Sequence, residues 1–257
     1  MHSQTASLGA QRMVAALGLV LLIGGWAWVA HGLPEYVLPG PLAVLKATAR
    51  FLYEPELMAH AGISLLRVVL SVVLAMTIAI LVAALVRRFP ILDEAVERRI
   101  LTFLNSFPSV GWAILGVIWF QISTPTVLFV QVAIILPFCL INALAGFRQI
   151  DPEMDELGHS LTRNAWRRFR LLSVPLVAPF LIAGLRVAYG ICWKIALVAE
   201  LFGARSGLGF QLSRSQTTSD ATMVFACCLI IVLIYTVTDW LVLRVLSQRF
   251  AAGQERG

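Results

Sequence analysis

The sequence predicts an all-α polytopic membrane protein with about six transmembrane helices, and three observations lead to this fold class. First, 59% of the 257 residues are hydrophobic and only 13% are charged, whereas a soluble domain is about half apolar and about a quarter charged. Second, the apolar residues form continuous runs of about 20 residues, the length of a membrane-spanning helix. Third, these runs do not alternate between apolar and polar residues as the strands of a membrane β-barrel do.

Six apolar runs are candidate spans. They cover residues 13–30, 63–86, 110–122, 126–147, 174–201 and 223–245. The third run is short for a span, but it extends back through residues 101–107. The first run resembles a signal peptide, yet it is long for one and further spans follow, so we favour an uncleaved first helix. Three prolines follow it, and residues 41–53 then predict an amphipathic helix at the outer membrane surface.

The positions of the basic residues predict the orientation in the membrane. With the N-terminus inside, the inner segments contain Arg12, Arg87, Arg88, Arg98, Arg99, Arg148, Arg163, Arg167, Arg168, Arg170, Arg244, Arg249 and Arg256. The outer segments contain only Lys46, Arg50, Arg205 and Arg214. Because cytoplasmic loops carry the excess of Lys and Arg, both termini are expected in the cytoplasm.

The motifs of common enzymes are missing from the sequence. It has no G-x-x-x-x-G-K-[ST] phosphate loop, no H-E-x-x-H and no G-x-S-x-G, and its four histidines are scattered. The four cysteines lie in apolar runs without the spacing of a metal site or a disulfide framework. The net charge of +6 does not form a basic face on a polar domain, so nucleic acid is not an expected partner. We therefore expect neither a catalytic nor a metal site in this chain.

A charged segment, ELGHSLTRNAWRRFRLLSVP, runs from Glu156 to Pro175 between the fourth and fifth runs. Asp151 and Pro152 before it are typical of a helix start, and the acidic residues that follow suit the positive end of a helix dipole. Its apolar residues recur every three or four positions, and a break between two short helices is expected at residues 162–164. Two interpretations stay open on the residues alone: a helix lying on anionic lipid, or a docking element for a cytoplasmic partner.

This segment resembles the cytoplasmic loop of permease subunits in bacterial ABC importers, which has the form E-A-A, three residues, G, nine residues, I-x-L-P. Alignment on Pro175 places Glu156 on the glutamate of the motif, Leu157 and Gly158 on its two alanines, and Thr162 on its glycine. Four further stretches resemble the nitrate, sulfonate and taurine branch of that family, so that the resemblance covers about residues 38–249. They are SLLRVVLS from Ser64, SFPSVGW from Ser106, GLRVAYGICWKIALVAELFGARSGLGFQL from Gly184 and TDWLVLRVLSQR from Thr238.

The segment also departs from the motif of the family. Leu157 and Gly158 replace the alanines, and Thr162 replaces the glycine. Glycine permits a left-handed turn without steric cost, and threonine does not. These departures leave open a different turn, a differently shaped groove on the partner, or a heterodimer in which a second permease carries the standard motif.

The resemblance implies the fold of a type I ABC importer permease in the bacterial inner membrane. The organisation expected is one transmembrane domain over residues 1–257, with a core at about 60–249 and a cytoplasmic coupling loop at about 148–173. The implied partners are a second permease copy or paralogue, a periplasmic or lipid-anchored binding protein, and a cytoplasmic ATPase dimer. The ATPase would bind ATP and Mg, so this chain needs no cofactor of its own.

The resemblance also assigns roles within the coupling loop. It implies that Glu156 pairs with a basic group of the ATPase. It further implies that Leu161 and Trp166 fill a cleft on the ATPase, and that Arg163 and Arg167 fix the orientation.

Ionisable residues inside the expected spans are candidates for the translocation path. Trp193 and Lys194 are expected to line it, and a buried lysine would favour an anion such as a sulfonate, nitrate or carboxylate. Glu200 is a further candidate, although it lies on a different face of the helix from Lys194. For Arg67, Arg186 and Asp239 the alternative is an internal ion pair or a position near the membrane surface.

The stretch SGLG, from Ser206 to Gly209, suits a tight turn or a re-entrant loop on the outer side. The resemblance implies that Ser206, Gly207 and Gly209 form an outer gate and meet the binding protein, while a plain extracellular turn is the alternative. Three other function classes compete with an importer permease. A stand-alone secondary transporter usually has internal repeats, which the sequence lacks; a membrane-embedded enzyme and a structural scaffold are the others. The solute stays open among sulfonates, taurine, nitrate, bicarbonate-like anions and a vitamin precursor.

Overall fold

The structure is a computed structural model and describes residues 2–150 and 164–243. Within these residues the secondary structure is helical without any strand, which confirms the all-α fold class. The chain divides into two compact units. The smaller unit holds the residues up to Met58 and Gln211–Ile230, and the larger unit holds Ala59–Phe210 and the residues from Ile231 on. The organisation as one transmembrane domain over residues 1–257 stays a prediction.

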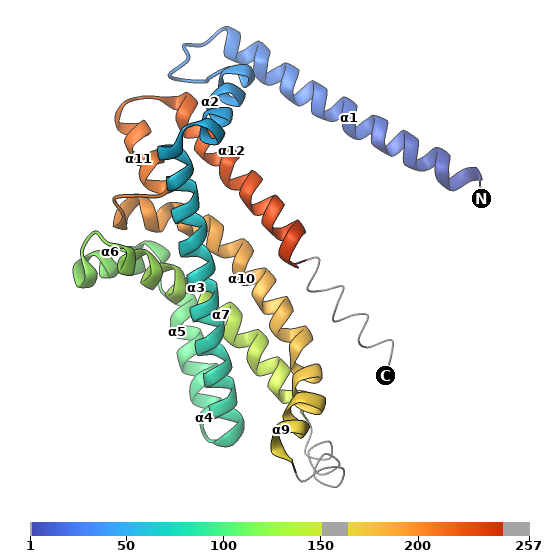
Figure 1. Cartoon of the computed structure of the whole chain (residues 1–257), viewed down its shortest axis with the longest axis vertical. Helices are drawn as coiled ribbons and strands as arrows, with labels where there is room; N and C mark the ends of the chain where they lie inside the picture. The colour runs from blue at the N-terminus through green and yellow to red at the C-terminus, as the bar shows by residue number, and fades with distance from the viewer. Residues whose placement is uncertain (1, 151–163, 244–257) are drawn as a thin grey trace. The chain divides into compact units, whose positions relative to one another are not determined.

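The helices carry the labels of Figure 1. The smaller unit contains α1 (His2–His31), α2 (Pro41–Tyr53) and parts of α11 (Leu208–Thr217) and α12 (Ala221–Thr238), together with the first four residues of α3 (Pro55–Arg88). The larger unit contains the rest of α3 and α4 (Leu92–Glu94), α5 (Leu101–Ser106), α6 (Ser109–Phe120), α7 (Thr124–Arg148), α9 (Ala165–Arg168) and α10 (Val174–Gly203). The described residues also contain three π-helical segments. η1 (Ala95–Ile100) joins α4 to α5, η2 (Phe169–Ser173) joins α9 to α10, and η3 (Asp239–Leu243) follows α12.

The smaller unit contains the helix expected at residues 41–53. α2 begins with Pro41, which is tolerated there because an amide at this position would have no acceptor inside the helix. Its buried residues recur at every third or fourth position: Val44, Ala47, Thr48 and Phe51. α1, in contrast, leaves most of its described apolar side chains uncovered, and Leu22 and Trp28 are 75% and 80% exposed. Such a surface is unfavourable in water and suits a lipid environment.

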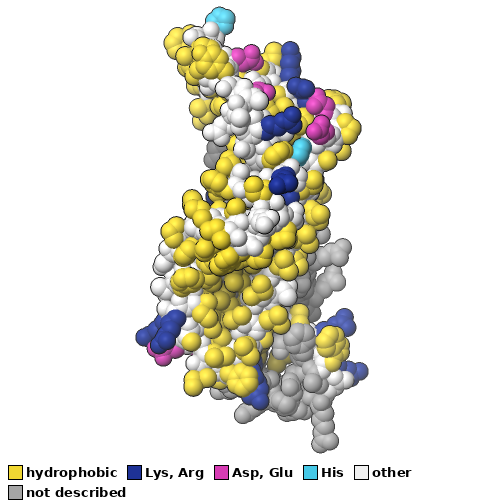
Figure 2. Space-filling view, turned by 90° about the vertical axis from the view of Figure 1, so that its left-hand side faces the viewer, with side chains coloured by type: hydrophobic (Ala, Val, Ile, Leu, Met, Phe, Trp, Pro, Cys, Tyr) yellow, Lys and Arg dark blue, Asp and Glu magenta, His cyan; other side chains and the backbone are white. Residues whose placement is uncertain are grey.

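Five described segments are long and apolar enough to cross a membrane. They are Met13–His31, Pro55–Arg88, Thr124–Arg148, Arg170–Gly203 and Ala221–Leu241. A sixth candidate is the pair Leu92–Ser106 and Ser109–Phe120. This count agrees with about six expected spans, and Figure 2 shows hydrophobic side chains over much of the face that it presents. The chain is therefore a multi-pass membrane protein.

The third expected span differs from the straight extension that the sequence suggested, because its two helices meet at 86°. The break falls at Pro108, which has no amide hydrogen and cannot continue a helix. Phe107, directly before it, adopts an extended conformation with φ −75° and ψ 127°. A residue that precedes proline is driven into this region by steric contact with the proline ring. The segment is thus a broken span or a re-entrant loop.

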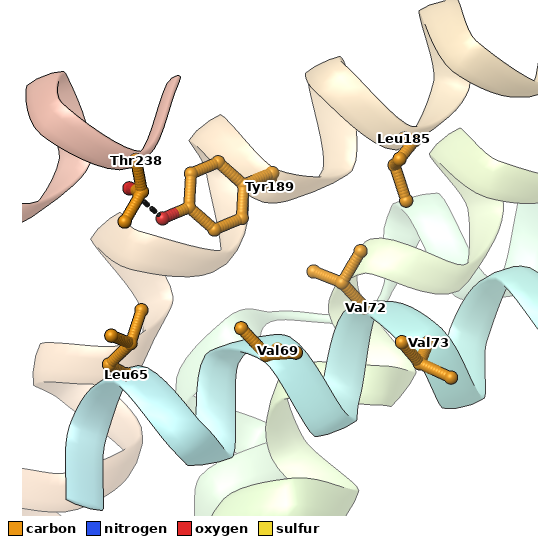
Figure 3. A pocket seen from close by; sticks show the side chains of 7 residues that line it. All are labelled: Leu65, Val69, Val72, Val73, Leu185, Tyr189 and Thr238. Carbon is orange, nitrogen blue, oxygen red and sulfur yellow. Dashed lines mark hydrogen bonds between the residues drawn. The ribbon is translucent and has the colours of Figure 1, made fainter. Parts of the chain in front are cut away.

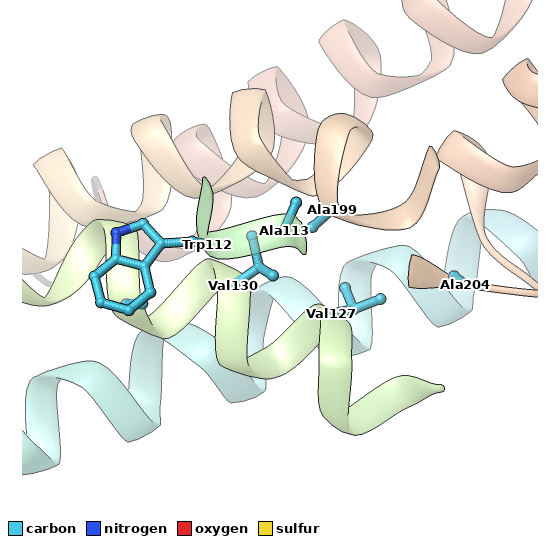
Figure 4. Close-up of a cluster of buried hydrophobic side chains, with 7 residues drawn as sticks. Trp112, Ala113, Val127, Val130, Ala199 and Ala204 are labelled. Carbon is cyan, nitrogen blue, oxygen red and sulfur yellow. The ribbon is translucent and has the colours of Figure 1, made fainter. Parts of the chain in front are cut away.

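One hydrophobic cluster in the core of the larger unit lies where α6, α7 and α10 meet (Figure 4). It consists of Trp112, Ala113, Val127, Val130, Ala133, Ala199 and Ala204. α7 and α10 approach closely because glycines lie between them: a Cβ added at Gly184 would lie 2.7 Å from the Asn142 Cβ, and one at Gly203 would lie 2.7 Å from the Thr126 Cγ2. Small residues allow helices in a membrane to pack in this way. α7 and α10 thereby provide a close-packed frame for the polar groups described below.

The described parts of the coupling loop are residues 148–150 and the residues from Asn164 on. The predicted helix start at Asp151 and Pro152 lies outside the described residues, as do Glu156, Leu157, Gly158, Leu161, Thr162 and Arg163. The Asn164 Oδ1 accepts hydrogen bonds from the amides of Trp166 at 3.0 Å and Arg167 at 3.3 Å, so Asn164 caps the first turn of α9. α9 leads through η2 into α10, whose second residue is Pro175. A helix therefore begins at the end of the break expected at residues 162–164.

Candidate functional site

A buried polar cluster joins α3, α10 and the turn that leads into α11. α3 contributes His60, Ser64 and Arg67, which lie on one face of the helix because their spacing is four and three. α10 contributes Glu200, three residues before its end. Arg67 and Glu200 are 4% and 1% exposed, so both charges are removed from solvent. We call these four side chains, together with the turn Ser206–Gly209, the Arg67–Glu200 cluster.

The Glu200 carboxylate receives hydrogen bonds from three elements. The Arg67 Nη1 lies 3.0 Å from Oε1. The Ser64 Oγ lies 2.9 Å from Oε1 and 2.7 Å from Oε2, so its single hydroxyl proton is donated to this carboxylate. The Gly209 amide donates to Oε2 at 2.9 Å. A buried charge pair stabilises a fold only when its remaining polar atoms are also bonded, and these contacts meet that condition for the carboxylate.

Arg67 continues the network into the turn and to α7. Its Nη1 donates to the Ser206 carbonyl oxygen at 2.7 Å, and its Nη2 donates to the Ser206 Oγ at 2.9 Å. The same Nη2 donates to the Thr124 Oγ1 at 2.9 Å, at the first residue of α7. One guanidinium therefore ties α3 to α7, to α10 and to the α10–α11 turn.

The first amides of α11 are held by side chains of the cluster. The Gly207 amide donates to the His60 Nδ1 at 3.0 Å, and the Leu208 amide donates to the Ser64 Oγ at 2.7 Å. With the bond from Gly209 to Glu200, three consecutive amides are satisfied by α3 and α10. The first amides of a helix have no acceptor within it, so these contacts fix the position at which α11 begins.

The two glycines of SGLG are required by the closeness of Glu200. Gly207 has φ +106°, and a Cβ there would lie 2.4 Å from the Glu200 carboxylate. A Cβ on Gly209 would lie 2.6 Å from the Glu200 Cβ. The backbone of the turn can therefore approach the carboxylate only with glycine at both positions. The structure thus brings the expected gate residues Ser206, Gly207 and Gly209 into one site with Glu200.

Arg67 is a member of this site that the sequence does not predict. An internal ion pair is one alternative expected for Arg67, but its partner is not predicted, and Glu200 is expected in the translocation path. In the structure the Glu200 carboxylate is enclosed by its partners, so a solute does not reach it in this conformation. A signal was present in the sequence, because His60, Ser64 and Arg67 are polar residues at helical spacing in an otherwise apolar region.

Trp193 and Lys194 do not line one surface together. Trp193 is 3% exposed and packs inside the larger unit. Lys194 is exposed, contrary to the expectation of a buried lysine, and no described side chain pairs with it. It lies on the same side of α10 as Val187 and Val198, which are 46% and 38% exposed. This face of α10 is therefore largely apolar, with one cation within it.

Two expectations for the other charged residues can be compared with the structure. The Arg186 Nη2 lies 3.4 Å from the Asp239 Oδ2, so the two residues pair, but 64% of the Arg186 side chain is exposed and the pair is not enclosed. Trp166 is 68% exposed, and Arg167 is exposed as well. An exposed tryptophan beside an exposed arginine suits either interpretation of the charged segment, docking or lipid contact.

The larger unit also contains an apolar cavity of about 390 Å³ (Figure 3). It is lined by Leu65, Val69, Val72, Val73, Leu185, Tyr189 and Thr238. The Tyr189 and Thr238 hydroxyls bond to each other, so neither needs a partner inside the cavity. A cavity with this lining has no charged group to recognise an ionic solute, which separates it from the candidate path at Lys194.

Comparisons with known proteins agree with the membrane fold. Residues 75–251 match the model of the family described as binding-protein-dependent transport system inner membrane component. A probable ABC transporter permease protein of Brucella abortus (strain 2308) is 26% identical over 256 residues, which is 100% of both chains. The putative aliphatic sulfonates transport permease protein SsuC of Bacillus subtilis is 26% identical over 79% of this chain and 73% of its own. The riboflavin transport system permease protein RibX of Chloroflexus aurantiacus is 30% identical over 84% of this chain and 81% of its own.

Proposed function

The chain belongs to the family of binding-protein-dependent transport system inner membrane components, and on that premise we propose that it forms the translocation path of an ATP-driven importer for a small anionic solute. As an ABC permease subunit it is a transport component, and we assign ATP hydrolysis to a partner subunit. The proposal adds the class of solute, the residue that attracts it and the segment that couples transport to hydrolysis.

The anionic solute is proposed from the position of Lys194. This residue lies nine positions before the end of α10 at Gly203, so at 1.5 Å per residue it is about 14 Å along the helix from that end. A charged side chain that faces lipid at such depth is unfavourable, so exposed lysines in spans face water or another subunit. We therefore assign the exposed face of α10 to a water-filled path, and a cation there raises the local concentration of anions.

The relatives do not determine the solute. The name of SsuC refers to aliphatic sulfonates and the name of RibX refers to riboflavin, and these two kinds of solute differ in charge and size. The sulfonate relative agrees with an anion at Lys194, whereas the riboflavin relative does not require one. Sulfonates, taurine or nitrate are the solutes that this proposal favours.

Coupling to the ATPase is assigned to residues 148–173 and the start of α10. On this proposal the ATPase-contacting residues are Glu156, Leu157, Gly158, Leu161, Thr162, Arg163, Trp166, Arg167 and Pro175. Asn164 fixes the first turn of α9, so that Trp166 and Arg167 are presented on an ordered helix. The ATPase dimer binds ATP and Mg, a second permease copy or paralogue completes the path, and a periplasmic or lipid-anchored binding protein delivers the solute.

The proposed orientation places both termini in the cytoplasm of a bacterial cell, with the protein in the inner membrane. Arg87 and Arg88 at the end of α3 and Arg148 at the end of α7 then lie on the cytoplasmic side. This arrangement follows the preference of Lys and Arg for cytoplasmic segments. The Arg67–Glu200 cluster and SGLG then lie toward the outer side, where the binding protein would dock.

The test compares the wild-type chain with Lys194→Gln in proteoliposomes that also contain the ATPase and the loaded binding protein. We expect an aliphatic sulfonate, but not riboflavin, to stimulate hydrolysis, and Lys194→Gln to reduce sulfonate uptake by roughly tenfold or more. Lys46→Gln is the matched control, because Lys46 is an exposed lysine on α2. Unchanged sulfonate uptake by Lys194→Gln, or stimulation by an uncharged solute alone, would contradict the anionic path.

A further inference from the structure

We propose that four charged residues on α3, α4, η1 and α7 hold Ile150, which directly precedes residues 151–163 of the coupling loop, and so transmit a displacement of that loop to the spans. The residues are Arg87, Asp93, Glu97 and Arg148, and we call them the arginine tie. All four belong to the larger unit. Arg148 is the first residue of the coupling loop, but none of the four is among the residues to which contact with the ATPase is assigned above. The inference rests on that function, because it describes how the ATPase moves this chain.

Arg148 bridges two carboxylates on consecutive helical turns. Its Nη2 lies 2.8 Å from the Asp93 Oδ1, and its Nη1 lies 2.9 Å from the Glu97 Oε1. Asp93 and Glu97 are four residues apart on α4 and η1, so their side chains face the same direction. The planar guanidinium donates in two directions at fixed geometry, which a lysine does not do. Arg148 thus fixes the last residue of α7 against both turns.

Arg87 holds the same end of α7 from α3. Its Nη1 donates to the Phe147 carbonyl oxygen at 3.2 Å and to the Ile150 carbonyl oxygen at 2.8 Å. The last carbonyls of a helix have no donor within it and carry partial negative charge, so an arginine there is stabilising. Ile150 is itself 6% exposed, which means that the chain is anchored up to this residue.

Polar contacts, and not apolar packing alone, join these helix ends. A cavity of about 210 Å³ lies between them, lined by residues that include Val86, Pro90 and Leu144. A space of this size removes part of the packing that would otherwise lock one helix against another. The hydrogen bonds and ion pairs of the arginine tie span the interface around this cavity, so they determine how rigidly α7 follows α3 and η1.

The place of the tie in the chain gives it a function. Ile150 directly precedes residues 151–163, which contain six of the proposed ATPase contacts: Glu156, Leu157, Gly158, Leu161, Thr162 and Arg163. A displacement of that segment reaches the spans through the end of α7, and the arginine tie transmits part of this displacement to α3 and η1. Without the tie, the last turn of α7 would absorb the displacement by local fraying. Arg87 and Arg148 are therefore positioning residues that act after the ATPase has docked.

The arginine tie contributes little to folding, which makes it testable by substitution. The side chains of Arg148, Asp93 and Glu97 are 48%, 42% and 47% exposed. Ion pairs of this exposure are screened by water and salt and contribute weakly to stability. We therefore expect Arg148→Gln to fold and to retain the ATPase.

The experiment uses the full complex in proteoliposomes and compares the wild-type chain with Arg148→Gln. Three quantities are measured: ATPase copurification, hydrolysis stimulated by the solute-loaded binding protein, and solute moved per ATP. We expect copurification to be unchanged, and solute moved per ATP to fall between about twofold and thirtyfold, the range for residues that carry coupling between sites. Arg148→Lys, which keeps the charge but not the fork, should give an intermediate value.

Two further variants separate the tie from a general loss of charge. Arg98→Gln is the matched control, because Arg98 lies on η1, its ion pair is with Glu94 one helical turn away at 3.4 Å, and 80% of its side chain is exposed. It should behave as wild type. The double variant Asp93→Asn with Glu97→Gln should reproduce Arg148→Gln, and combining all three should cause no additional loss, since the partners act through one contact.

The possible outcomes distinguish this inference from the proposed function. If the wild-type chain recruits no ATPase, the proposed function is wrong and the tie is wrong with it. Two outcomes with an active wild-type complex would overturn the tie alone. In one, Arg148→Gln moves as much solute per ATP as wild type; in the other, Arg148→Gln no longer binds the ATPase. An equal loss in Arg98→Gln would likewise overturn the tie.

Discussion

The Arg67 guanidinium and the Glu200 carboxylate lie 3.0 Å apart, although 133 positions separate them in the sequence. Both side chains are almost fully buried, and the pair joins α3 to the end of α10. Ser64 and the Gly209 amide complete the hydrogen bonding of the carboxylate. The consequence is that the start of α11 is held by charged and polar groups from two spans, and not by the turn alone.

Removal of one member of this pair should destabilise the larger unit strongly. We expect Arg67→Met to reduce the free energy of unfolding by about 3–5 kcal/mol, because it leaves Glu200 as a buried, uncompensated charge. Arg67→Met combined with Glu200→Gln should recover part of that loss. The melting temperature of the purified protein in detergent measures the difference. Arg50→Met is the control, since the Arg50–Glu54 pair is exposed and contributes little; equal destabilisation by the control would contradict the account.

Alanine at Gly207 should disturb the same cluster through the backbone. Gly207 has φ +106°, and an added Cβ would lie 2.4 Å from the Glu200 carboxylate. Gly207→Ala is expected to lower the free energy of unfolding by at least about 1–3 kcal/mol and to impair transport. Gly62→Ala is the matched variant, because nothing lies within 4 Å of its added Cβ and it is inside a helix, where alanine is favoured by about 1 kcal/mol. A neutral Gly207→Ala would show that the turn is not fixed as described.

Ser71 and Gln131 form a second polar contact inside the larger unit. The Ser71 Oγ donates to the Gln131 Oε1 at 2.6 Å, and both residues are fully buried. Ser71→Ala leaves the amide without this donor in an apolar region and should lower the melting temperature, with a loss of about 0.6–2 kcal/mol in the free energy of unfolding. Thr77→Ala is the control, because the Thr77 hydroxyl is exposed and bonds only to its own helix. Indistinguishable melting of the two variants would argue against the contact between α3 and α7.

The Asn164 cap should affect the presentation of Trp166. Asn164→Ala removes the acceptor for the Trp166 and Arg167 amides, and a lost cap costs about 0.5–2 kcal/mol of helix stability. If Trp166 docks on the ATPase, this variant should weaken ATPase binding severalfold in a pull-down titration. Asn164→Asp keeps a capping oxygen and should bind as wild type. If wild type, Asn164→Ala and Asn164→Asp bound the ATPase with equal affinity, the order of α9 would not contribute to docking.

The sequence was sufficient for the parts of the fold that depend on local chemistry. The spans followed from the length of the apolar runs, and α2 followed from Pro41 and the spacing of its apolar residues. The family followed from the motifs near Ser64, Gly184 and Glu156, and the match to residues 75–251 confirms it. The 86° bend could have been expected from Pro108, which ends one helix before the next begins.

The candidate site could not be predicted to the same extent, because its partners come from distant spans. Glu200 was considered beside Lys194, its neighbour in the sequence, whereas its partner is Arg67 on α3. The side of α10 that faces the interior depends on how α3, α6 and α7 pack against it, so the exposure of Lys194 did not follow from its position in an apolar run. The role of Glu156 and its neighbours through Arg163 stays a prediction.

Copurification is the measurement that tests the central claim most directly. The chain would be extracted gently from its native membranes, and the presence of an ATP-hydrolysing subunit would be compared for wild type, Trp166→Asp and Trp166→Phe. The account predicts that wild type and Trp166→Phe retain the ATPase and that Trp166→Asp loses it, because a charged side chain does not fill an apolar cleft. A wild-type chain that carries no ATPase, or a Trp166→Asp variant that retains it fully, would contradict the coupling role of this segment.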